Sequence, residues 1–372
     1  MSSAITVTGR PERTGGAAGR YWHRADDGRL QCDLCPRFCR LREGQRGLCF
    51  VRAREGDAIV LTTYGRSSGF CIDPVEKKPL YHFLPGTPVL SFGTAGCNLA
   101  CKFCQNWDIS KARDFDRLQE RASPEAIAHA ARASGSRSVA FTYNDPVIFL
   151  EYAVDAAAAC REAGIHTVAV TAGYITPAPR AEFFAGMDAV NVDLKAFSDR
   201  FYRKLCGARL GPVLETLEYL AQDTECWLEI TILVIPGEND DPLELERMTR
   251  WIADRLGPDV PLHFSAFHPA WKMADHPATP PGTLRRARAI ARGNGLHHVY
   301  LGNVHDAEGA ATYCPSCGEI VIGRDGYRLT EWAIRAHAGA GECAHCGASV
   351  AGVFEARPGD WGARYRRVHP GH

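Results

Sequence analysis

Short segments of apolar and β-branched residues alternate with longer amphipathic segments across the middle of the chain. Seven apolar segments lie between residues 88 and 303: Val89–Phe92, Ser138–Tyr143, His166–Thr171, Ala189–Leu194, Trp227–Val234, Leu262–Phe267 and Val299–Gly302. Most are apolar at nearly every position, as expected of parallel strands that are covered on both faces. This alternation predicts an α/β fold with one parallel sheet, either an open doubly wound sheet or a full or partial barrel.

The segments between these strands carry helix-start signals. Ser123 can cap a helix that has Pro124 at its first position and Glu125 in its first turn, and Asp241 with Pro242 repeats the arrangement. Polar residues and glycines follow each predicted strand, in Gly93–Cys97, Thr142–Pro146, Thr171–Tyr174, Asp193–Phe197, Val234–Asp240, Ala266–Trp271 and Leu301–His305. Because the carboxyl ends of parallel strands share one edge of a sheet, we expect these segments to surround one pocket.

Composition narrows the class of protein. The chain has 372 residues, of which 45% are hydrophobic, and Lys plus Arg and Asp plus Glu both number 43. This balance gives no overall field to attract nucleic acid or an anionic membrane. No apolar run is long enough to span a bilayer, and the N-terminal residues lack the apolar core of a signal peptide. We expect residues 1–28 to form a flexible tail.

The fifteen cysteines are the most informative part of the composition. Eleven fall into three clusters with two- or three-residue spacings, which favours metal binding over disulfides. Thiolate metal sites need a reducing compartment, so we expect a cytoplasmic protein. The remaining four are isolated, and we interpret them as small buried apolar residues: Cys71, Cys160, Cys206 and Cys226.

The central cluster is Cys97, Cys101 and Cys104, spaced C-x3-C-x2-C directly after a predicted strand. Most iron–sulfur cages use four cysteines. A three-cysteine loop therefore predicts a 4Fe–4S cluster with one iron left open, as catalytic metal sites keep an open position. The alternative is a zinc site completed by a distant His or Asp.

Two further cysteine clusters flank the predicted barrel. The upstream one, Cys32, Cys35, Cys39 and Cys49, fits either a zinc ion or an auxiliary iron–sulfur cluster. The downstream one consists of two C-x2-C-G knuckles separated by 25 residues: Cys314, Cys317, Cys343 and Cys346. Four thiolates at glycine-rich turns predict a zinc ribbon or a rubredoxin-like knuckle. A few basic residues follow it without forming a dense patch, so we do not expect nucleic-acid binding.

The C-x3-C-x-aromatic-C pattern, with Phe103 as the aromatic residue, resembles the radical S-adenosylmethionine (radical SAM) superfamily. The resemblance implies a partial (βα)6 barrel. It also implies that the open iron binds the amino and carboxylate groups of SAM, which is therefore the missing ligand. Reduction of such a cluster cleaves SAM to methionine and a 5′-deoxyadenosyl radical.

Within this superfamily the chain is similar to the activating-enzyme branch typified by pyruvate formate-lyase activating enzyme. In that branch an asparagine two positions after the last cluster cysteine lies beside SAM, and Asn106 holds this place. Asn144 and Asp145 stand where the branch has a Gly-Gly-Glu that binds the methionyl ammonium. Asp145 can still accept a charge-assisted hydrogen bond. The alternative for Asn106 and Asp145 is helix capping.

Three more residues match this branch. Asp193 and Lys195 correspond to its D-x-K element, where the lysine suits the SAM carboxylate. His268 matches a strand-end histidine that contacts the adenosine. The alternatives are a structural ion pair for Asp193 and Lys195 and a hydrogen-bonded core histidine for His268.

A narrower resemblance is to the radical SAM enzyme of the AmmeMemoRadiSam system. It is carried by the stretches GTAGCNLACKFCQNWDIS, AFTYNDPVIFLEY and NVDLKAFSDRFYRKLCG and by both flanking cysteine modules. The resemblance implies Memo-like and AMMECR-domain proteins as partners, and it leaves the substrate open.

Together these features predict a cytoplasmic radical SAM oxidoreductase. We expect a tail at 1–28, a cysteine-rich module at 29–80, the barrel at 81–305 and a zinc-ribbon-like module at 306–372. The electron donor would be of the flavodoxin or ferredoxin type. Two alternatives stay open: a glycyl-radical enzyme activase, and a metal-stabilised binding or electron-transfer protein that does not cleave SAM.

Overall fold

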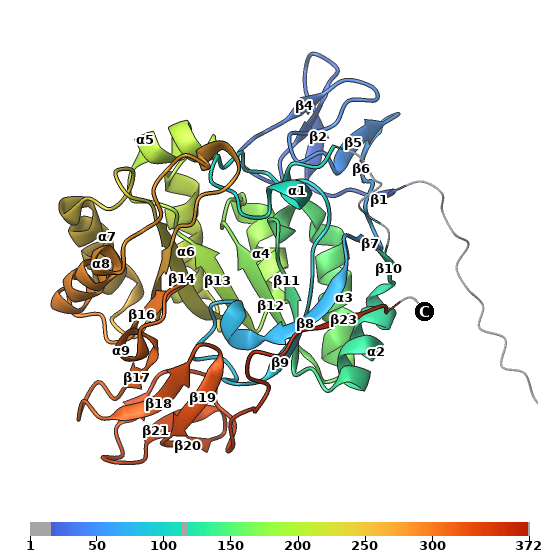
Figure 1. Ribbon diagram of the computed structural model, residues 1–372. Helices are drawn as coiled ribbons and strands as arrows, with labels where there is room; N and C mark the ends of the chain where they lie inside the picture. Colours follow the sequence, from blue (N-terminus) through green and yellow to red (C-terminus); the bar gives the residue numbers. More distant parts are fainter. Residues whose placement is uncertain (1–15, 114–117, 119, 371–372) are drawn as a thin grey trace, which may run out of the picture.

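A twisted, largely parallel sheet forms the centre of the computed structural model, which describes residues 16–113, 118 and 120–370 (Figure 1). Within these residues the sheet has nine strands in the order β16-β15-β14-β13-β12-β11-β9-β8-β23. Seven are mutually parallel: β9 (Pro88–Phe92), β11 (Ser138–Phe141), β12 (His166–Thr171), β13 (Ala189–Asp193), β14 (Trp227–Val234), β15 (Leu262–Ala266) and β16 (Val299–Gly302). Every predicted strand is confirmed, to within two residues at each end.

One helix follows each of the first six parallel strands and covers the outer face of the sheet (Figure 1). These helices are α2 (Pro124–Ser134), α3 (Leu150–Glu162), α4 (Pro177–Ala185), α6 (Gly211–Asp223), α7 (Pro242–Leu256) and α8 (Pro281–Gly293). The predicted caps are confirmed: Ser123 accepts a hydrogen bond from the Ala126 amide, and Asp241 accepts from the amides of Leu243 and Glu244. Six strand–helix units around a parallel sheet agree with the α/β fold predicted from the sequence.

The other edge of the sheet is built from distant parts of the chain. Strand β8 (Phe70–Pro74) pairs antiparallel with β9, and β23 (Arg366–Val368) pairs antiparallel with β8. The last described strand thus returns to the sheet after the C-terminal module. Short elements lie elsewhere in the fold: α1 (Trp107–Ser110) and α5 (Asp199–Phe201), and the paired strands β7 (Arg66–Ser67) and β10 (Glu120–Arg121).

Two small three-stranded sheets make up the N-terminal module, which lies near α1 (Figure 1). Their strands are β1 (Ala17–Ala18), β2 (Trp22–Arg24), β3 (Leu30–Cys32), β4 (Arg40–Leu41), β5 (Arg52–Glu55) and β6 (Ala58–Leu61). The expected flexible tail is therefore too long. Residues 1–15 lie outside the described residues, but β1 pairs with β6 and β2 pairs with β3. These backbone pairings order a segment whose sequence has no strong apolar pattern.

The C-terminal module has its own small core beside the main sheet (Figure 1). It begins with α9 (Ala307–Ala310) and contains two antiparallel sheets, formed by β17 (Thr312–Tyr313), β18 (Ile320–Asp325) and β19 (Arg328–Trp332), and by β20 (Ile334–His337), β21 (Ala340–Cys343) and β22 (Ser349–Val350). Val321, Ile322 and Phe354 are buried between them. None of the helices in the described part of the chain is long and apolar enough to cross a membrane.

Candidate active site

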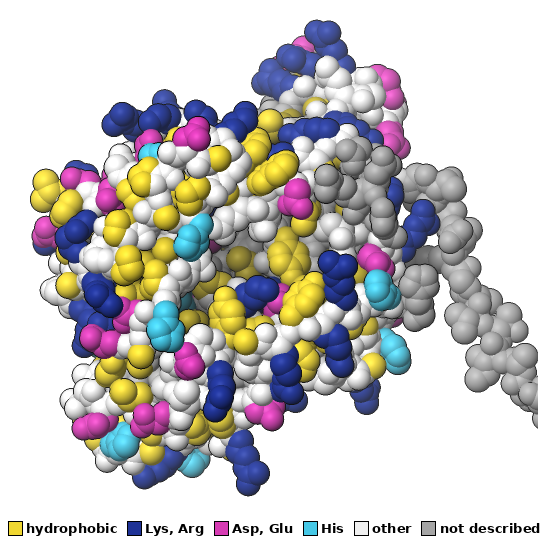
Figure 2. Space-filling view, viewed as in Figure 1, with side chains coloured by type: hydrophobic (Ala, Val, Ile, Leu, Met, Phe, Trp, Pro, Cys, Tyr) yellow, Lys and Arg dark blue, Asp and Glu magenta, His cyan; other side chains and the backbone are white. Residues whose placement is uncertain are grey.

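A cavity of about 410 Å³ lies where the carboxyl ends of the parallel strands meet the three-cysteine loop. Figure 2 shows the face of the molecule hollowed at its centre, with basic side chains beside the hollow. Nine of the ten residues that the sequence predicts for the cluster and SAM line this cavity: Cys97, Cys101, Phe103, Cys104, Asn106, Asn144, Asp145, Asp193 and Lys195. Five of the seven strand-end segments therefore meet around one pocket, as expected from a parallel sheet, whereas Val234–Asp240 and Ala266–Trp271 do not line it.

Close backbone packing holds the three-cysteine loop in place. Gly96 has φ +81°, and a Cβ there would lie 1.9 Å from the carbonyl oxygen of Cys49. Only glycine fits this position, because both the left-handed backbone and the close approach exclude a side chain. From the next strand end, Asn144 accepts a hydrogen bond from the Thr94 amide (3.2 Å) and donates to the Gly96 carbonyl (2.7 Å). Asn144 is thus a positioning residue for the loop.

The spacing of the loop sulfurs separates the two kinds of metal site considered above. Two thiolates bound to one zinc ion at about 2.3 Å cannot be more than about 4.6 Å apart. Among the described residues, the only group of three or more ligand atoms within 4.8 Å of one another is in the C-terminal module. Cys97, Cys101 and Cys104 line one cavity but do not form such a close group. Their arrangement fits a polynuclear cluster, in which different irons bind different cysteines.

The Cys101 sulfur has a neighbour that the sequence did not indicate. The thiol of Cys206, at the end of the π-helical turn Tyr202–Cys206, lies beside Cys101 and lowers the pKa of the Cys101 thiol. The backbone of this turn also holds the loop, since the Cys206 carbonyl accepts from the Ala100 amide (2.8 Å). The interpretation of Cys206 as an isolated apolar residue is therefore incomplete. By contrast, burial raises the pKa of Cys97 to about 12.

Asp145 both caps a helical turn and faces the cavity. Its Oδ1 accepts from the Val147 amide (3.1 Å) and from the Thr171 hydroxyl (2.9 Å). Its side chain is buried, and burial raises the pKa of its carboxyl to about 6. The capping alternative is correct for Asp145, but the carboxyl also lines the cavity, where a cationic ligand would stabilise its ionised form.

Asn106 stands at the N-cap position, directly before α1, but its side chain does not cap the helix. Its side-chain amide instead donates to the Tyr143 carbonyl (2.8 Å), so the capping alternative is wrong for this residue. Tyr143 has φ +71°, an uncommon backbone conformation for a non-glycine residue. Its hydroxyl donates to Asp73 (3.0 Å) on the antiparallel strand β8.

Asp193 and Lys195 form the ion pair considered from the sequence, with Lys195 Nζ 3.0 Å from Asp193 Oδ2. Lys195 is well buried. Burial lowers its pKa, but Asp193 together with Cys101 and Cys206 outweighs this effect and holds the pKa well above the usual lysine value. Because both residues line the cavity, Lys195 is a fixed cation within it.

His268 does not belong to this cavity. It follows β15, but its side chain is exposed and is not among the lining residues. The core-histidine alternative is therefore wrong, and the contact with the adenosine stays a prediction. The chain turns outward after Ala266, so that the strand end contributes Ser265 to the cavity.

The structure adds lining residues that sequence reasoning missed. Lys78 contacts the buried Asp73 (2.7 Å), and Lys111 Nζ donates to the Leu99 carbonyl within the cysteine loop (2.9 Å). Tyr327 reaches the cavity from the turn between β18 and β19 in the C-terminal module. It also lines an adjoining cavity of about 370 Å³. Tyr327 and Asp73 have no local sequence signal, because their positions depend on contacts between distant segments.

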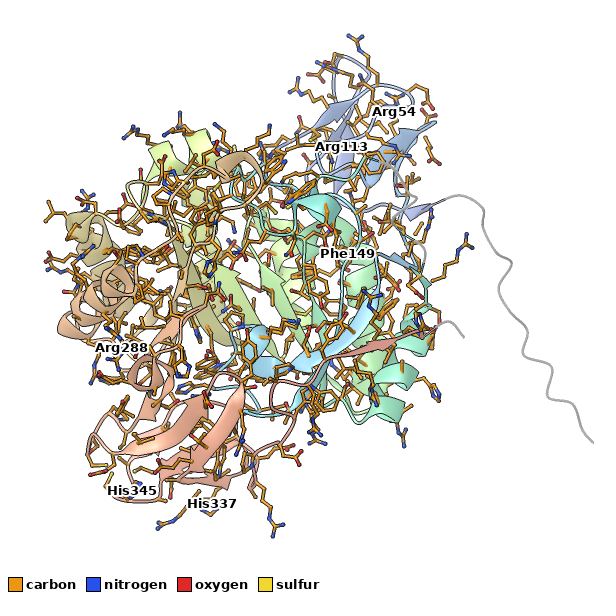
Figure 3. All side chains as sticks on the ribbon, in the orientation of Figure 1. Arg54, Arg113, Phe149, Arg288, His337 and His345 are labelled. Atoms are coloured by element: carbon orange, nitrogen blue, oxygen red, sulfur yellow. The ribbon has the colours of Figure 1, made fainter. Side chains whose placement is uncertain are left out.

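The four downstream cysteines form a second potential metal centre. Their sulfurs lie within 4.8 Å of one another, with Cys314 3.6 Å from Cys346 and Cys317 3.8 Å from Cys343. These separations fit one ion held tetrahedrally by four thiolates. Gly318 and Gly347 both have φ +77°, as the tight knuckle turns require. His345, within the second knuckle, lies at the outer end of the module (Figure 3).

The four upstream cysteines also come together. Cys32, Cys35, Cys39 and Cys49 line one apolar cavity between the N-terminal module and the barrel. Three of them are buried, and Cys39 is partly exposed. The structure thus brings together all three cysteine clusters that the sequence predicts.

The chain is similar in sequence to a known family and to known proteins. The radical SAM superfamily profile matches residues 92–248, which include the three-cysteine loop. An uncharacterized protein of Methanocaldococcus jannaschii is 40% identical over 304 residues, covering 82% of this chain and 90% of the relative. Pyruvate formate-lyase 1-activating enzyme of Escherichia coli is 27% identical over 176 residues, covering 46% of this chain and 70% of that enzyme.

One solved structure with a similar arrangement is a radical SAM methyltransferase from Sphaerobacter thermophilus. The match covers 64% of this chain and 71% of that one, with 18% sequence identity and a TM-score of 0.46.

Proposed function

The chain belongs to the radical SAM superfamily, and on that premise we propose that it reductively cleaves SAM at a 4Fe–4S cluster held by Cys97, Cys101 and Cys104. The observation that carries the proposal is their convergence with Asp145 and Lys195 in one cavity of about 410 Å³. Such a cluster with SAM bound supplies a 5′-deoxyadenosyl radical for hydrogen abstraction. The protein side chains around the cluster bind and orient the reactants and exclude water.

The side chains around the cavity offer an opposite charge to each charged group of the SAM methionyl moiety. Asp145 would accept a charge-assisted hydrogen bond from the methionyl ammonium, and Lys195 would face the carboxylate. Both groups are held by protein contacts, Asp145 by Thr171 and Lys195 by Asp193. Prior fixation reduces the side-chain entropy that binding would otherwise cost.

The substrate would occupy the adjoining cavity of about 370 Å³, which shares Lys77, Thr231 and Tyr327 with the SAM cavity. The C-terminal module contributes Tyr327 to both cavities, so that module would shape the substrate site. We propose that its four cysteines hold zinc, which fixes the hairpin carrying Tyr327. A closed four-thiolate site of this kind is structural.

We further propose membership of the AmmeMemoRadiSam system, with Memo-like and AMMECR-domain proteins as partners and a flavodoxin- or ferredoxin-type protein as electron donor. The shared stretches and both cysteine modules support this assignment. Extensive thiolate metal chemistry supports a reducing, cytoplasmic location.

The decisive experiment is anaerobic reconstitution with iron and sulfide, followed by addition of SAM and a strong reductant. We expect 5′-deoxyadenosine from the wild type and from Cys160→Ala, whose cysteine is buried in α3 away from the cavity. Cys101→Ala should give none. If a wild-type protein with a full cluster gives no 5′-deoxyadenosine, the proposal fails. A glycine-centred radical in a partner protein would instead identify an activase.

A further inference from the structure

The upstream cysteines surround a cavity whose other walls come from the barrel. Apolar residues of both units line it, among them Leu34 and Leu41 of the N-terminal module and Val147 and Ile148 before α3. All four of these apolar residues are 3% exposed or less. Phe149, in the same turn, is buried and packs against Phe92 of β9, below this module in the view of Figure 3. The thiols are thus shielded from water, as inorganic clusters in proteins often are.

The spacing of these sulfurs argues against a single zinc ion. The upstream cysteines are not among the groups of described residues that converge closely enough to hold one ion, whereas the downstream cysteines are. One zinc ion limits any two bound sulfurs to about 4.6 Å, but a cluster that ligates a different iron with each thiolate needs a wider cage. The backbone at Gly47 lies against two of the sulfurs. A Cβ there would lie 3.6 Å from the Cys49 sulfur and 3.7 Å from the Cys39 sulfur, in ordinary van der Waals contact with both.

Two buried arginine N–H groups beside this cavity have no hydrogen-bond partner. Arg52 is 1% exposed, and its Nε is unpaired, although its other nitrogens bind Glu151 and the Arg20 carbonyl. Arg37 donates from Nε to the Asn98 carbonyl (2.7 Å), while its buried Nη2 is unpaired. Buried donors without partners are costly and therefore rare. Both arginines line the cysteine cavity, where an anionic, sulfur-rich group would satisfy them.

We propose that Cys32, Cys35, Cys39 and Cys49 bind a second 4Fe–4S cluster, with all four irons ligated by the protein and with Arg37 and Arg52 donating to its sulfurs. With no open iron, the cluster would transfer single electrons rather than bind SAM. It lies directly behind the three-cysteine loop, since the Cys49 carbonyl packs against Gly96. This cluster would pass one electron from the protein donor to the three-cysteine cluster, and this relay rests on the proposed function. The assignment of a 4Fe–4S cluster to the four upstream cysteines does not rest on it.

The test uses a variant that lacks the three-cysteine iron site of the barrel. The variant Cys97→Ala/Cys101→Ala/Cys104→Ala, reconstituted anaerobically, should retain about four irons and about four sulfides per chain, compared with about eight of each in the wild type. Adding Cys32→Ala and Cys35→Ala should abolish both, whereas adding Cys226→Ala should not. Circular dichroism and retention of the C-terminal metal check folding. Zinc in place of iron at this site, or no iron in the triple variant, overturns the proposal.

A second variant tests the arginine contacts through a property that folding alone does not change. In the triple-alanine background, Arg37→Gln removes a positive charge and a donor beside the cluster. We expect its reduction potential to become more negative, because the reduced, more anionic state loses stabilisation. Arg40→Gln, at an exposed position on β4, is the matched control. Equal potentials in both variants would contradict the proposed contacts. A wild type that contains this cluster but yields no 5′-deoxyadenosine would refute the proposed function alone.

Discussion

The N-terminal module is joined to the barrel by a buried ion pair whose energetic effect can be measured. Arg52 on β5 donates to both carboxylate oxygens of Glu151 on α3, at 2.8 and 3.0 Å, and both side chains are almost fully buried. The Arg20 amide also donates to Glu151 (2.6 Å). Replacing Arg52 by Met removes one partner and leaves the Glu151 carboxylate buried without its counter-charge.

Breaking a buried pair in this way costs about 3 to 5 kcal/mol. Arg52→Met and Glu151→Leu should each lower the free energy of opening of β5 and β6 by this amount. Because a factor of ten corresponds to about 1.4 kcal/mol, amide hydrogen exchange in these strands should accelerate at least about a hundredfold. The double variant should be less destabilised than either single variant, since no unpaired charge remains.

Hydrogen exchange followed by mass spectrometry, on reconstituted protein with its iron content determined, measures this effect strand by strand. The strands β18 and β19 of the other module are an internal control. The exposed pair formed by Arg255 and Glu218 is the matched control, and Arg255→Met should cost less than about 1 kcal/mol. An acceleration below about fivefold in both single variants, or a double variant that is worse than either, would refute the reasoning.

Three further predictions concern other parts of the molecule. Asp145→Asn should weaken SAM binding, measured by calorimetry, about tenfold to a hundredfold, because it removes a charge-assisted hydrogen bond. The fold should persist, since an asparagine can still cap the helical turn. An affinity for SAM within threefold of wild type would exclude binding of the methionyl ammonium by Asp145. Burial raises the pKa of the Glu76 carboxyl to about 7, above its value in the unfolded chain. The protonated carboxyl therefore contributes about 3 kcal/mol to the free energy of unfolding below about pH 4.5, and this contribution is lost as the pH rises through 7. Glu76→Gln should remove this part of the pH dependence of unfolding, and an unchanged profile would contradict it. Cys343→Ser, at a fully buried cysteine, should abolish zinc binding by the C-terminal module in metal analysis and lower the melting temperature of that module. The control Cys160→Ala should retain about one zinc per chain. Zinc retained in the serine variant would refute the site.

The parallel strands were predictable because burial on both faces leaves a continuous apolar run. Where a predicted end is wrong, a specific contact explains it. The sequence extends one strand to Tyr143, but β11 ends at Phe141, because Tyr143 turns to positive φ and places its hydroxyl on Asp73. That partner lies on β8, an antiparallel strand that no local pattern distinguishes from a loop.

The candidate site was predictable as far as its residues follow strand ends or cysteine spacing. Asp145, Asp193 and Lys195 line the cavity because parallel strands bring their carboxyl ends together. His268 also follows a strand end, but its side chain is exposed and does not line the cavity. Cys206 approaches Cys101 only through a π-helical turn, whose side-chain direction cannot be inferred from sequence spacing.

The central claim is that three thiolates leave one iron open for SAM. Electron–nuclear double resonance on the reduced Cys32→Ala/Cys35→Ala variant, with SAM labelled at its carboxylate oxygens and amino nitrogen, tests this claim most directly. We expect hyperfine coupling from both labels to the cluster held by Cys97, Cys101 and Cys104. A fully reduced cluster that shows no coupling at saturating SAM would contradict it.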